Sequence, residues 1–364
     1  MKAAGIGLGT GAAVLGLALL VSACSQTVTG RAVSVYADPF TVAGLPATNG
    51  PSGLRADVAP PPVVADNTDE GLVDRLAVTA IGDIEAYWAS EYPQLFGGTF
   101  TPVDRVVSWD SEADTGITFC DTETFALANA GYCPLDNTIG WDRTTLLPAM
   151  IETFGEMSVV MILAHEYGHA VQHQSGIATD EAPGIVAEQQ ADCFGGAFIR
   201  HVAEGQSTHF TLNTSDGLNS VLAATVSIRD SDPNDPESIH GSAFERVTAV
   251  QVGFIDGPAA CTRIDPVEIN GRRGELPQQF SSPDQTGELP VTAATLDEFR
   301  KALDSMFGLR ESPAVDYSGA NALCADAPWT EPVSYCPASN TIGVDLPALA
   351  AMGTPQEMPD TDIA

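Results

Sequence analysis

Positive charge is scarce in this chain. Its 364 residues include 15 Lys and Arg against 48 Asp and Glu, which gives a formal net charge of −33 at pH 7. Lysine is limited to Lys2 and Lys301. A surface this negative repels nucleic acid and anionic lipid head groups, and it keeps a protein soluble. We therefore expect no nucleic-acid partner.

Motifs of several other protein classes are missing as well. The chain contains no CxxC pair, so a structural zinc ribbon is not expected. It contains no Gly-x-Gly-x-x-Gly segment and no P-loop, which are the usual signatures of nucleotide-binding sites. It also offers no Ser-His-Asp or Cys-His arrangement for a covalent nucleophile. We therefore do not expect a nucleotide-dependent enzyme or a serine or cysteine hydrolase.

An uncharged segment follows Lys2. Residues 3–21 are rich in Ala, Leu and Gly and lead into Val21-Ser22-Ala23-Cys24. This pattern resembles a bacterial lipobox, so we expect residues 1–23 to be a lipoprotein signal peptide and Cys24 to be lipidated. An uncleaved transmembrane anchor and ordinary secretion are the alternatives. All three place the folded part outside the cytoplasm, and the first anchors it to the extracytoplasmic face of the cell membrane.

Six cysteines remain after Cys24, an even number that suits an oxidising compartment. Their number leaves many pairings open. Proximity in the sequence favours two disulfides, and the two cysteines left over would form a third. The expected pairs are Cys120–Cys133, Cys324–Cys336 and Cys193–Cys261.

Composition and hydrophobic periodicity divide the chain into segments. Residues 24–67 are rich in Pro, Gly, Ala, Val and Thr without periodicity, which predicts a flexible tether. Residues 68–265 form the main domain, residues 266–290 a linker, and residues 291–364 an appendage. Helices are expected at Asp69–Trp88, Thr144–Phe154, Met157–Gln174, Glu181–Glu204, Asp216–Ile228, Ser242–Phe254 and Thr295–Phe307. Strands are expected at Asp104–Trp109, Gly116–Cys120 and Gly131–Trp141.

A short block of sequence occurs twice. Tyr132-Cys133-Pro134 returns as Tyr335-Cys336-Pro337, and Asn137-Thr138-Ile139-Gly140 returns as Asn340-Thr341-Ile342-Gly343, at the same spacing. Each copy has a cysteine upstream and, further back, a helical segment with an aromatic residue. No histidine follows His240, so the second copy cannot form a second metal site. We expect residues 291–364 to be non-catalytic.

The most informative motif is His-Glu-Tyr-Gly-His at residues 165–169, which follows an apolar stretch. On a helix, His165 and His169 lie one turn apart on the same face, where two imidazoles can bind one Zn²⁺. Glu166 is adjacent to the first ligand and can contact a water at the metal. Unpaired polar groups on a buried helix are costly, and a metal supplies their partner.

A catalytic zinc needs a third protein ligand and an open fourth position. Glu188 lies 19 residues after His169, on the next expected helix. Asp192 lies one turn further, faces the same way, and can accept the other N–H of a ligand histidine. We therefore expect His165, His169 and Glu188 to bind one zinc ion per chain, with Asp192 behind them.

The order of several blocks resembles the bacterial neutral zinc metallopeptidase family, a member of the gluzincins, over about residues 70–262. The blocks are His165-Glu166-Tyr167-Gly168-His169-Ala170-Val171-Gln172, Glu188-Gln189-Gln190-Ala191-Asp192-Cys193-Phe194, Asp216-Gly217-Leu218-Asn219, and His240-Gly241-Ser242 with Glu245-Arg246. The resemblance implies a mainly helical, zincin-like catalytic domain with a small β-sheet. With the small C-terminal α/β appendage, the expected fold class is α+β.

The resemblance also implies roles for single residues. Glu166 would act as the general base, and His240 or Arg246 would stabilise the oxyanion. The expected function is a lipid-anchored zinc metallopeptidase that hydrolyses peptide or protein substrates in the cell envelope. Residues 131–142 would form the sheet edge where substrate adds as a further strand. The alternative is a non-catalytic zinc-containing envelope lipoprotein that acts as a binding or assembly module.

The remaining histidines have weaker signals. His173 continues the helix of the motif and is interpreted as structural. His201 and His209 have no partner that the sequence reveals, so both are expected at the surface. The acidic segment Asp230–Glu237 matches the first ligand positions of a calcium loop but lacks its Gly and final Glu, so we expect a solvated loop.

Overall fold

A computed structural model describes residues 41–56, 58–178, 183–230, 239–273, 289–307, 311–318, 324 and 330–353. The chain divides into two units, Met1–Gly44 and Leu45–Ala364. The described part of the first unit contains the strand β1 (Thr41–Val42). The expected signal peptide and Cys24 lie outside the described residues. Within the described ranges, no helix combines the length and the apolar character needed to cross a bilayer.

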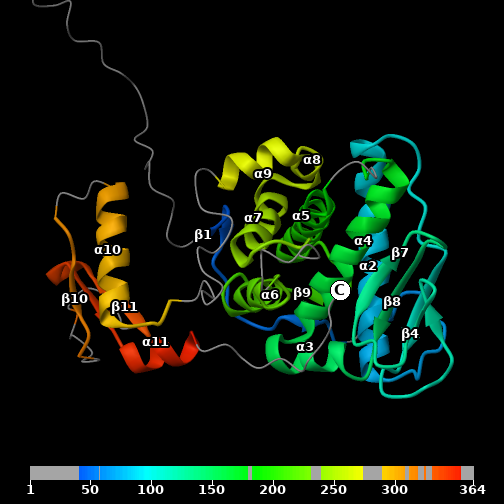
Figure 1. The fold of residues 1–364 in the computed structure, drawn as a ribbon, viewed down its shortest axis with the longest axis horizontal. Helices are drawn as coiled ribbons and strands as arrows, with labels where there is room; N and C mark the ends of the chain where they lie inside the picture. The colour runs from blue at the N-terminus through cyan, green and yellow to red at the C-terminus, as the bar shows by residue number, and fades with distance from the viewer. Residues whose placement is uncertain are drawn as a thin grey trace, which may run out of the picture. The chain divides into compact units, whose positions relative to one another are not determined.

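The second unit combines helices with small sheets, which confirms the α+β class (Figure 1). Every expected helix is present, and the largest difference is in α2, which continues to Leu95. The helices are α2 (Leu72–Leu95), α3 (Leu146–Phe154), α4 (Glu156–Ser175), α5 (Gly184–Ala203), α6 (Asp216–Ser227), α7 (Ala243–Asp256), α8 (Pro258–Cys261), α9 (Pro266–Arg273), α10 (Ala293–Phe307) and α11 (Leu346–Met352). The strands are β2 (Leu45–Pro46), β3 (Gly53–Leu54), β4 (Arg105–Trp109), β5 (Thr118–Phe119), β6 (Thr122–Glu123), β7 (Ala130–Cys133), β8 (Thr138–Asp142), β9 (Phe210–Thr211), β10 (Ala314–Asp316), β11 (Val333–Cys336) and β12 (Thr341–Val344).

A three-stranded sheet has the order β4-β8-β7, with β8 parallel to β4 and antiparallel to β7. The single strand expected at Gly131–Trp141 is therefore wrong, because these residues form a hairpin. Asn137 lies in its turn with φ 52°, a left-handed conformation that Asn tolerates better than most residues. β8 is buried along its whole length because strands flank it on both sides. β7 is an outer strand of this sheet.

The core of the second unit is built from α4, α5 and α7, which lie side by side in Figure 1. Buried side chains occur all around α4 and α5, as expected for helices that other elements enclose. Glycines let α5 and α7 approach closely, since a Cβ at Gly196 would lie 2.1 Å from the Val250 carbonyl oxygen. α7 begins with a capping box formed by Ser242 and Glu245. These contacts hold the helices that carry the motif residues.

The structure corrects the flexible tether expected at residues 24–67. The described residues 46–56 and 58–67 instead belong to the second unit: Gly53 and Leu54 pair with β9, and Asp66 forms a β-bridge with Val107 of β4. The backbone N–H of Thr48 donates to the Thr214 hydroxyl, and the backbone N–H of Thr214 donates to the Thr48 hydroxyl. The segment lacks periodicity because main-chain and hydroxyl groups, rather than an apolar face, attach it.

The linker expected at residues 266–290 is wrong for its first part. Pro266–Arg273 forms α9, with Ile269 buried. Arg272 donates to Gln189 of α5, and Arg273 forms an ion pair with Glu245 of α7 at 2.6 Å. A helix this polar has little apolar periodicity, so the charged contacts that stabilise it are not visible in the sequence.

The C-terminal module, residues 291–353, repeats part of the fold (Figure 1). Its sheet has the order β10-β12-β11, with one parallel and one antiparallel pair, as in β4-β8-β7. In both copies the repeated tyrosine donates a hydrogen bond to the repeated asparagine: Tyr132 to Asn137 at 3.1 Å and Tyr335 to Asn340 at 3.0 Å. The repeated sequence block is therefore a repeated structural unit.

All three expected disulfides are present: Cys120–Cys133, Cys193–Cys261 and Cys324–Cys336. The first and third occupy equivalent places in the two copies of the repeat. Cys193–Cys261 joins α5 to α8 in the buried core. Three cross-links of this kind suit an oxidising compartment.

Candidate metal centre

Helix α4 carries both histidines of the motif. Each turn of the helix advances 3.6 residues, so His165 and His169 project from one face. Their Nε2 atoms lie 3.2 Å apart, and their rings are perpendicular with centroids 4.8 Å apart. His165 is buried, and His169 is partly exposed. Both imidazoles thus direct a nitrogen toward one point.

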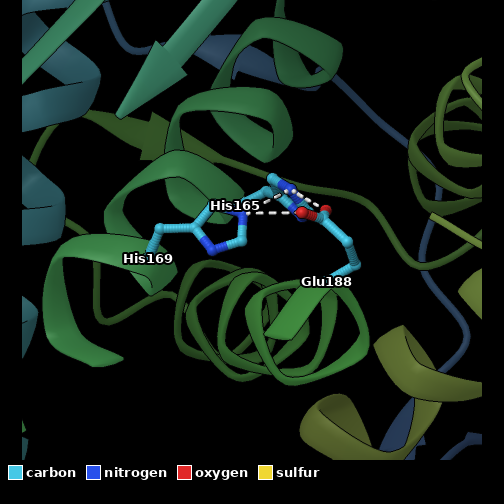
Figure 2. A group of neighbouring side chains, drawn as sticks. All are labelled: His165, His169 and Glu188. Carbon is cyan, nitrogen blue, oxygen red and sulfur yellow. Dashed lines mark hydrogen bonds and ion pairs between the residues drawn. The ribbon is translucent and has the colours of Figure 1, made fainter. Parts of the chain in front are cut away.

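Helix α5 brings Glu188 to the same point (Figure 2). Its Oε2 atom lies 3.2 Å from His165 Nε2, and its Oε1 atom lies 3.5 Å from His169 Nε2. Two ligands bound tetrahedrally at 2.0–2.1 Å from Zn²⁺ are separated by about 3.3 Å. The two imidazole nitrogens have this spacing, and each lies within 3.5 Å of one of the two Glu188 carboxylate oxygens.

A second observation on Glu188 supports the fit. Its Oε2 atom is buried and forms no hydrogen bond with any described residue. When His165 is neutral and donates from Nδ1 to Asp192, this buried oxygen faces the Nε2 lone pair at 3.2 Å, which is costly, and a cation between the carboxylate and the two imidazoles removes that cost. The donor set of two neutral imidazoles and one carboxylate is also a common set for catalytic zinc. The residues present therefore fit a zinc ion.

Asp192 fixes the orientation of His165. Its Oδ1 atom lies 2.8 Å from His165 Nδ1, in the place that the sequence predicted for it. A carboxylate accepts the Nδ1 proton, so the Nε2 lone pair is left for a metal. Asp192 is fully buried, which keeps water from competing for this hydrogen bond.

Gln172 plays the matching part for His169, and sequence reasoning missed it. Its Oε1 atom lies 2.9 Å from His169 Nδ1, and its Nε2 donates to the Ala187 carbonyl at 2.8 Å and to Gln190 Oε1 at 3.0 Å. The available signal was a glutamine three residues after a ligand histidine, on the buried side of the helix. Gln172 joins α4 to the start of α5.

Arg246 is held by two protein groups beside the metal cluster. Its guanidinium binds Asp192 through Nε at 2.9 Å and Nη2 at 2.8 Å, and it donates from Nη1 to the Ile228 carbonyl at 2.7 Å. These bonds commit all three of its nitrogens to protein partners. Arg246 stands behind Asp192 and also lines the cavity that Glu166 faces, so its expected role in stabilising an oxyanion stays a prediction.

His240 does reach the site. Its Nε2 atom lies 3.8 Å from Glu188 Oε2, while its Nδ1 atom lies 3.2 Å from Asp230 Oδ1. Asp230 Oδ2 also accepts from the Gly241 backbone at 2.6 Å. Asp230 thereby holds both the side chain and the backbone of the His240 segment. Most of the acidic loop, residues 231–238, lies outside the described residues. The expectation of a solvated loop without calcium therefore stays a prediction.

Glu166 faces a cavity of about 40 Å³. Its carboxylate forms no hydrogen bond to the described part of the chain, so it is available to a bound water. Burial raises the pKa of Glu166, and the neighbouring His165 and His169 partly offset this effect. A raised pKa suits a group that takes up a proton near neutral pH. The cavity is lined by Asn129, Ala130, Leu146, Ile162, His165, Glu166, Ile228, His240 and Arg246.

The carboxylates make this site favourable for positive charge. Burial alone would lower the pKa of His165, but Asp192 and Glu188 outweigh it and raise that pKa to about 10. Burial would raise the pKa of Glu188, yet His169 and His165 hold it well below its usual range. The field at the cluster therefore favours a bound proton or a bound cation.

The other histidines lie elsewhere. His173 is exposed on α4, with its ring 6.0 Å from that of Tyr132. His201 is partly buried and stacks on Phe198. The expectation that His209 lies at the surface is wrong, because it is buried and bonded to Asp83 and to the Ala59 carbonyl. Its partners are too distant in the sequence for the pairing to be foreseen.

Comparison with known proteins finds distant relatives. The chain is 27% identical over 164 residues to uncharacterized proteins of Mycobacterium bovis and of two strains of Mycobacterium tuberculosis. The match covers 38% of this chain and 56% of each relative, so the chain spans about half the length of the curated relatives that it matches. No family model matches the chain, and no solved structure matches it significantly.

Proposed function

We propose that this protein is a zinc metallopeptidase of the gluzincin kind. The observation that carries the proposal is the convergence of His165, His169 and Glu188, with Glu166 facing the adjoining cavity. Among the described residues this cluster has three members, so a fourth position remains for a water or a substrate oxygen. The proposed zincin-like domain and its likeness to the neutral zinc metallopeptidases rest on the same residues.

The chemistry assigned to the chain is proton transfer and charge stabilisation. Zinc, when bound, acts as a Lewis acid toward water and a scissile carbonyl. The Glu166 carboxylate accepts a proton from the attacking water and later delivers it to the leaving amine. His240 donates a hydrogen bond from Nε2 to the developing oxyanion, with its ring held by Asp230.

The position of β7 supports a peptide substrate. β7 is an outer strand that packs against α4, and its first residue, Ala130, lines the same cavity as His165 and Glu166. An extended peptide can add to such an edge through main-chain hydrogen bonds. We propose that the substrate lies along β7, with its scissile bond near Glu166.

We further propose that the protein acts in the cell envelope, anchored through lipid on Cys24. The three disulfides support an oxidising compartment. The substrates would then be peptides or proteins outside the cytoplasm.

The test uses the mature protein loaded with zinc and a mixture of fluorogenic peptides. Wild type should release peptide fragments, while Glu166→Gln should bind the same amount of zinc and release none. Zinc binding without hydrolysis by wild type, on peptides and on envelope proteins alike, would favour the non-catalytic lipoprotein instead. Absence of zinc would contradict both.

A further inference from the structure

Arg246 is the largest charged side chain in the described interior, with 1% of its surface exposed. Removing a guanidinium from water is costly unless its N–H groups are matched by acceptors. Two groups accept hydrogen bonds from Arg246, one on each side of its guanidinium. The first is the Asp192 carboxylate on α5, and the second is the Ile228 carbonyl at the end of α6. Arg246 itself belongs to α7, so this one side chain joins three helices.

The first side leads to the metal cluster. A guanidinium that binds both oxygens of a carboxylate fixes the plane of that carboxylate. Here the fixed group is Asp192, and its Oδ1 atom also accepts from His165 Nδ1 at 2.8 Å. The orientation of the His165 ring therefore depends on Arg246 through Asp192.

The second side leads to the segment that carries His240. Ile228 ends α6 and precedes Asp230 by two residues. Asp230 holds His240 through Nδ1 and Gly241 through its backbone N–H. Arg246 also lies one turn after Ser242, the N-cap that follows Gly241 directly. The His240 segment is thus attached to Arg246 on both sides.

We infer that Arg246 is a positioning residue that couples the metal ligand His165 to His240. Through Asp192 it aims the His165 lone pair, and through Ile228 it holds the segment from which His240 reaches the cavity. The proposed mechanism requires the metal held by His165 and the ring of His240 to lie beside one substrate carbonyl. The positions of both histidines then depend on the guanidinium of Arg246. This inference rests on the proposed function for the role of His240, while its effect on the metal ligand stands by itself.

Two substitutions of Arg246 test these contacts. Arg246→Met removes both. Arg246→Lys keeps a positive charge near Asp192, but one ammonium cannot reproduce the fork that binds Asp192 and Ile228 together. Arg200 provides the control, because it binds Glu204 and the Phe254 carbonyl and thus also connects α5 with α7. Arg200 lies about 18 Å along α5 from Glu188.

The first measurement is zinc affinity by chelator competition in the folded variants. Loss of a residue that orients a ligand typically weakens metal binding 10- to 100-fold. We expect a loss of that order for Arg246→Met and a smaller one for Arg246→Lys, with no change for Arg200→Met. Wild-type affinity in folded Arg246→Met would overturn the inference. If Arg246→Met fails to fold, Asp192→Asn replaces it and should show the same loss.

The second measurement is the nuclear magnetic resonance of the His240 ring in zinc-loaded protein. The ring signals should shift in Arg246→Lys and in Asp230→Asn, and they should stay in place in Arg200→Met. Unchanged His240 signals in Arg246→Lys would overturn the coupling. Neither measurement requires peptide hydrolysis. An inactive wild type would therefore contradict the proposed peptidase activity but would leave the inferred role of Arg246 unchanged.

Discussion

Gly168 of α4 packs directly against Ala191 of α5. A Cβ at Gly168 would lie 2.9 Å from the Ala191 Cα and 3.1 Å from its carbonyl oxygen. Gly168 lies on α4 between the ligands His165 and His169. Ala191 lies on α5, three residues after the ligand Glu188. The separation of α4 and α5 at this contact therefore sets the distance between the histidines and the carboxylate.

We expect Gly168→Ala to push the two helices apart and to weaken zinc binding. Overpacking of this kind costs about 1–3 kcal/mol of stability. Thermal unfolding and chelator competition measure the two effects. The matched control is Gly271→Ala in α9, where a Cβ meets open space and alanine should be neutral or slightly stabilising. Equal behaviour of the two variants would contradict a packing role for Gly168.

The ligand assignment predicts one zinc per chain, bound by His165, His169 and Glu188. Elemental analysis of purified mature protein should show this ratio, and Glu188→Ala should lower it sharply. A chelator should lower the melting temperature, since a ligand at 100 times its Kd stabilises by about 2.7 kcal/mol. If Glu188→Ala kept its zinc while Asp192→Ala lost it, the two carboxylates would have exchanged roles.

We expect a substitution of Glu166 to lower the rate of hydrolysis without changing the zinc content or the stability of the fold. Glu166→Gln should lower hydrolysis by about 10²- to 10⁴-fold, the usual contribution of a general acid–base group. Zinc content and melting temperature should stay at wild-type values, because the side chain neither ligates nor forms a hydrogen bond within the described residues. A variant with wild-type turnover would remove Glu166 from the mechanism.

Zinc binding should release protons. Because Asp192 and Glu188 raise the pKa of His165 to about 10, zinc must displace a proton from its ring at neutral pH. The apparent zinc affinity should therefore rise with pH through the neutral range. Calorimetry in buffers of different ionisation enthalpy counts the protons, and a count of zero at pH 7 would contradict the prediction.

The same raised pKa affects stability without zinc. A protonated His165 stabilises the folded state below its unfolded pKa of about 6.5, and this contribution is lost as the pH rises through about 10. Urea unfolding of the chelated protein at several pH values measures the trend. The His165→Gln variant should show a weaker dependence in that range.

Truncation after Gln285 tests the C-terminal module. The zinc cluster and the hydrogen bonds that support it belong to α4, α5 and α7 and to residues 228–230, so zinc binding should persist. Faster hydrolysis of folded protein substrates, with unchanged rates on short peptides, would show that the module limits access. Lower stability at unchanged activity would show that it only covers an edge. Loss of zinc would contradict the division of the chain.

Local patterns predicted much of the site. The spacing of His165 and His169 follows from the helical repeat, and the apolar residues before them indicate a buried helix. The capping box at Ser242 requires residues within one turn, so it too is visible in a short window. The repeated block likewise predicted the module of β10, β11 and β12.

Other features were not visible in this way. Gln172, Asp230 and His209 act through a few side-chain hydrogen bonds each, and such bonds leave no periodic pattern in the sequence. The attachment of residues 46–67 to β9 uses main-chain groups, which are the same for every residue type. The bond between Arg246 and Asp192 was also missed, because a lone arginine on a predicted helix does not reveal its partner.

The sequence by itself determined the longer helices, the two short-range disulfides and the residue types that can bind a metal, because these depend on local spacing and composition. The tertiary structure alone decided that α4 and α5 bring one ligand atom from each of His165, His169 and Glu188 within 4.8 Å of the others. It also decided that Arg246 supports Asp192 and that Asp230 supports His240. Such contacts join residues from different helices, and their geometry follows from how closely the helices pack, as at Gly168 and Ala191.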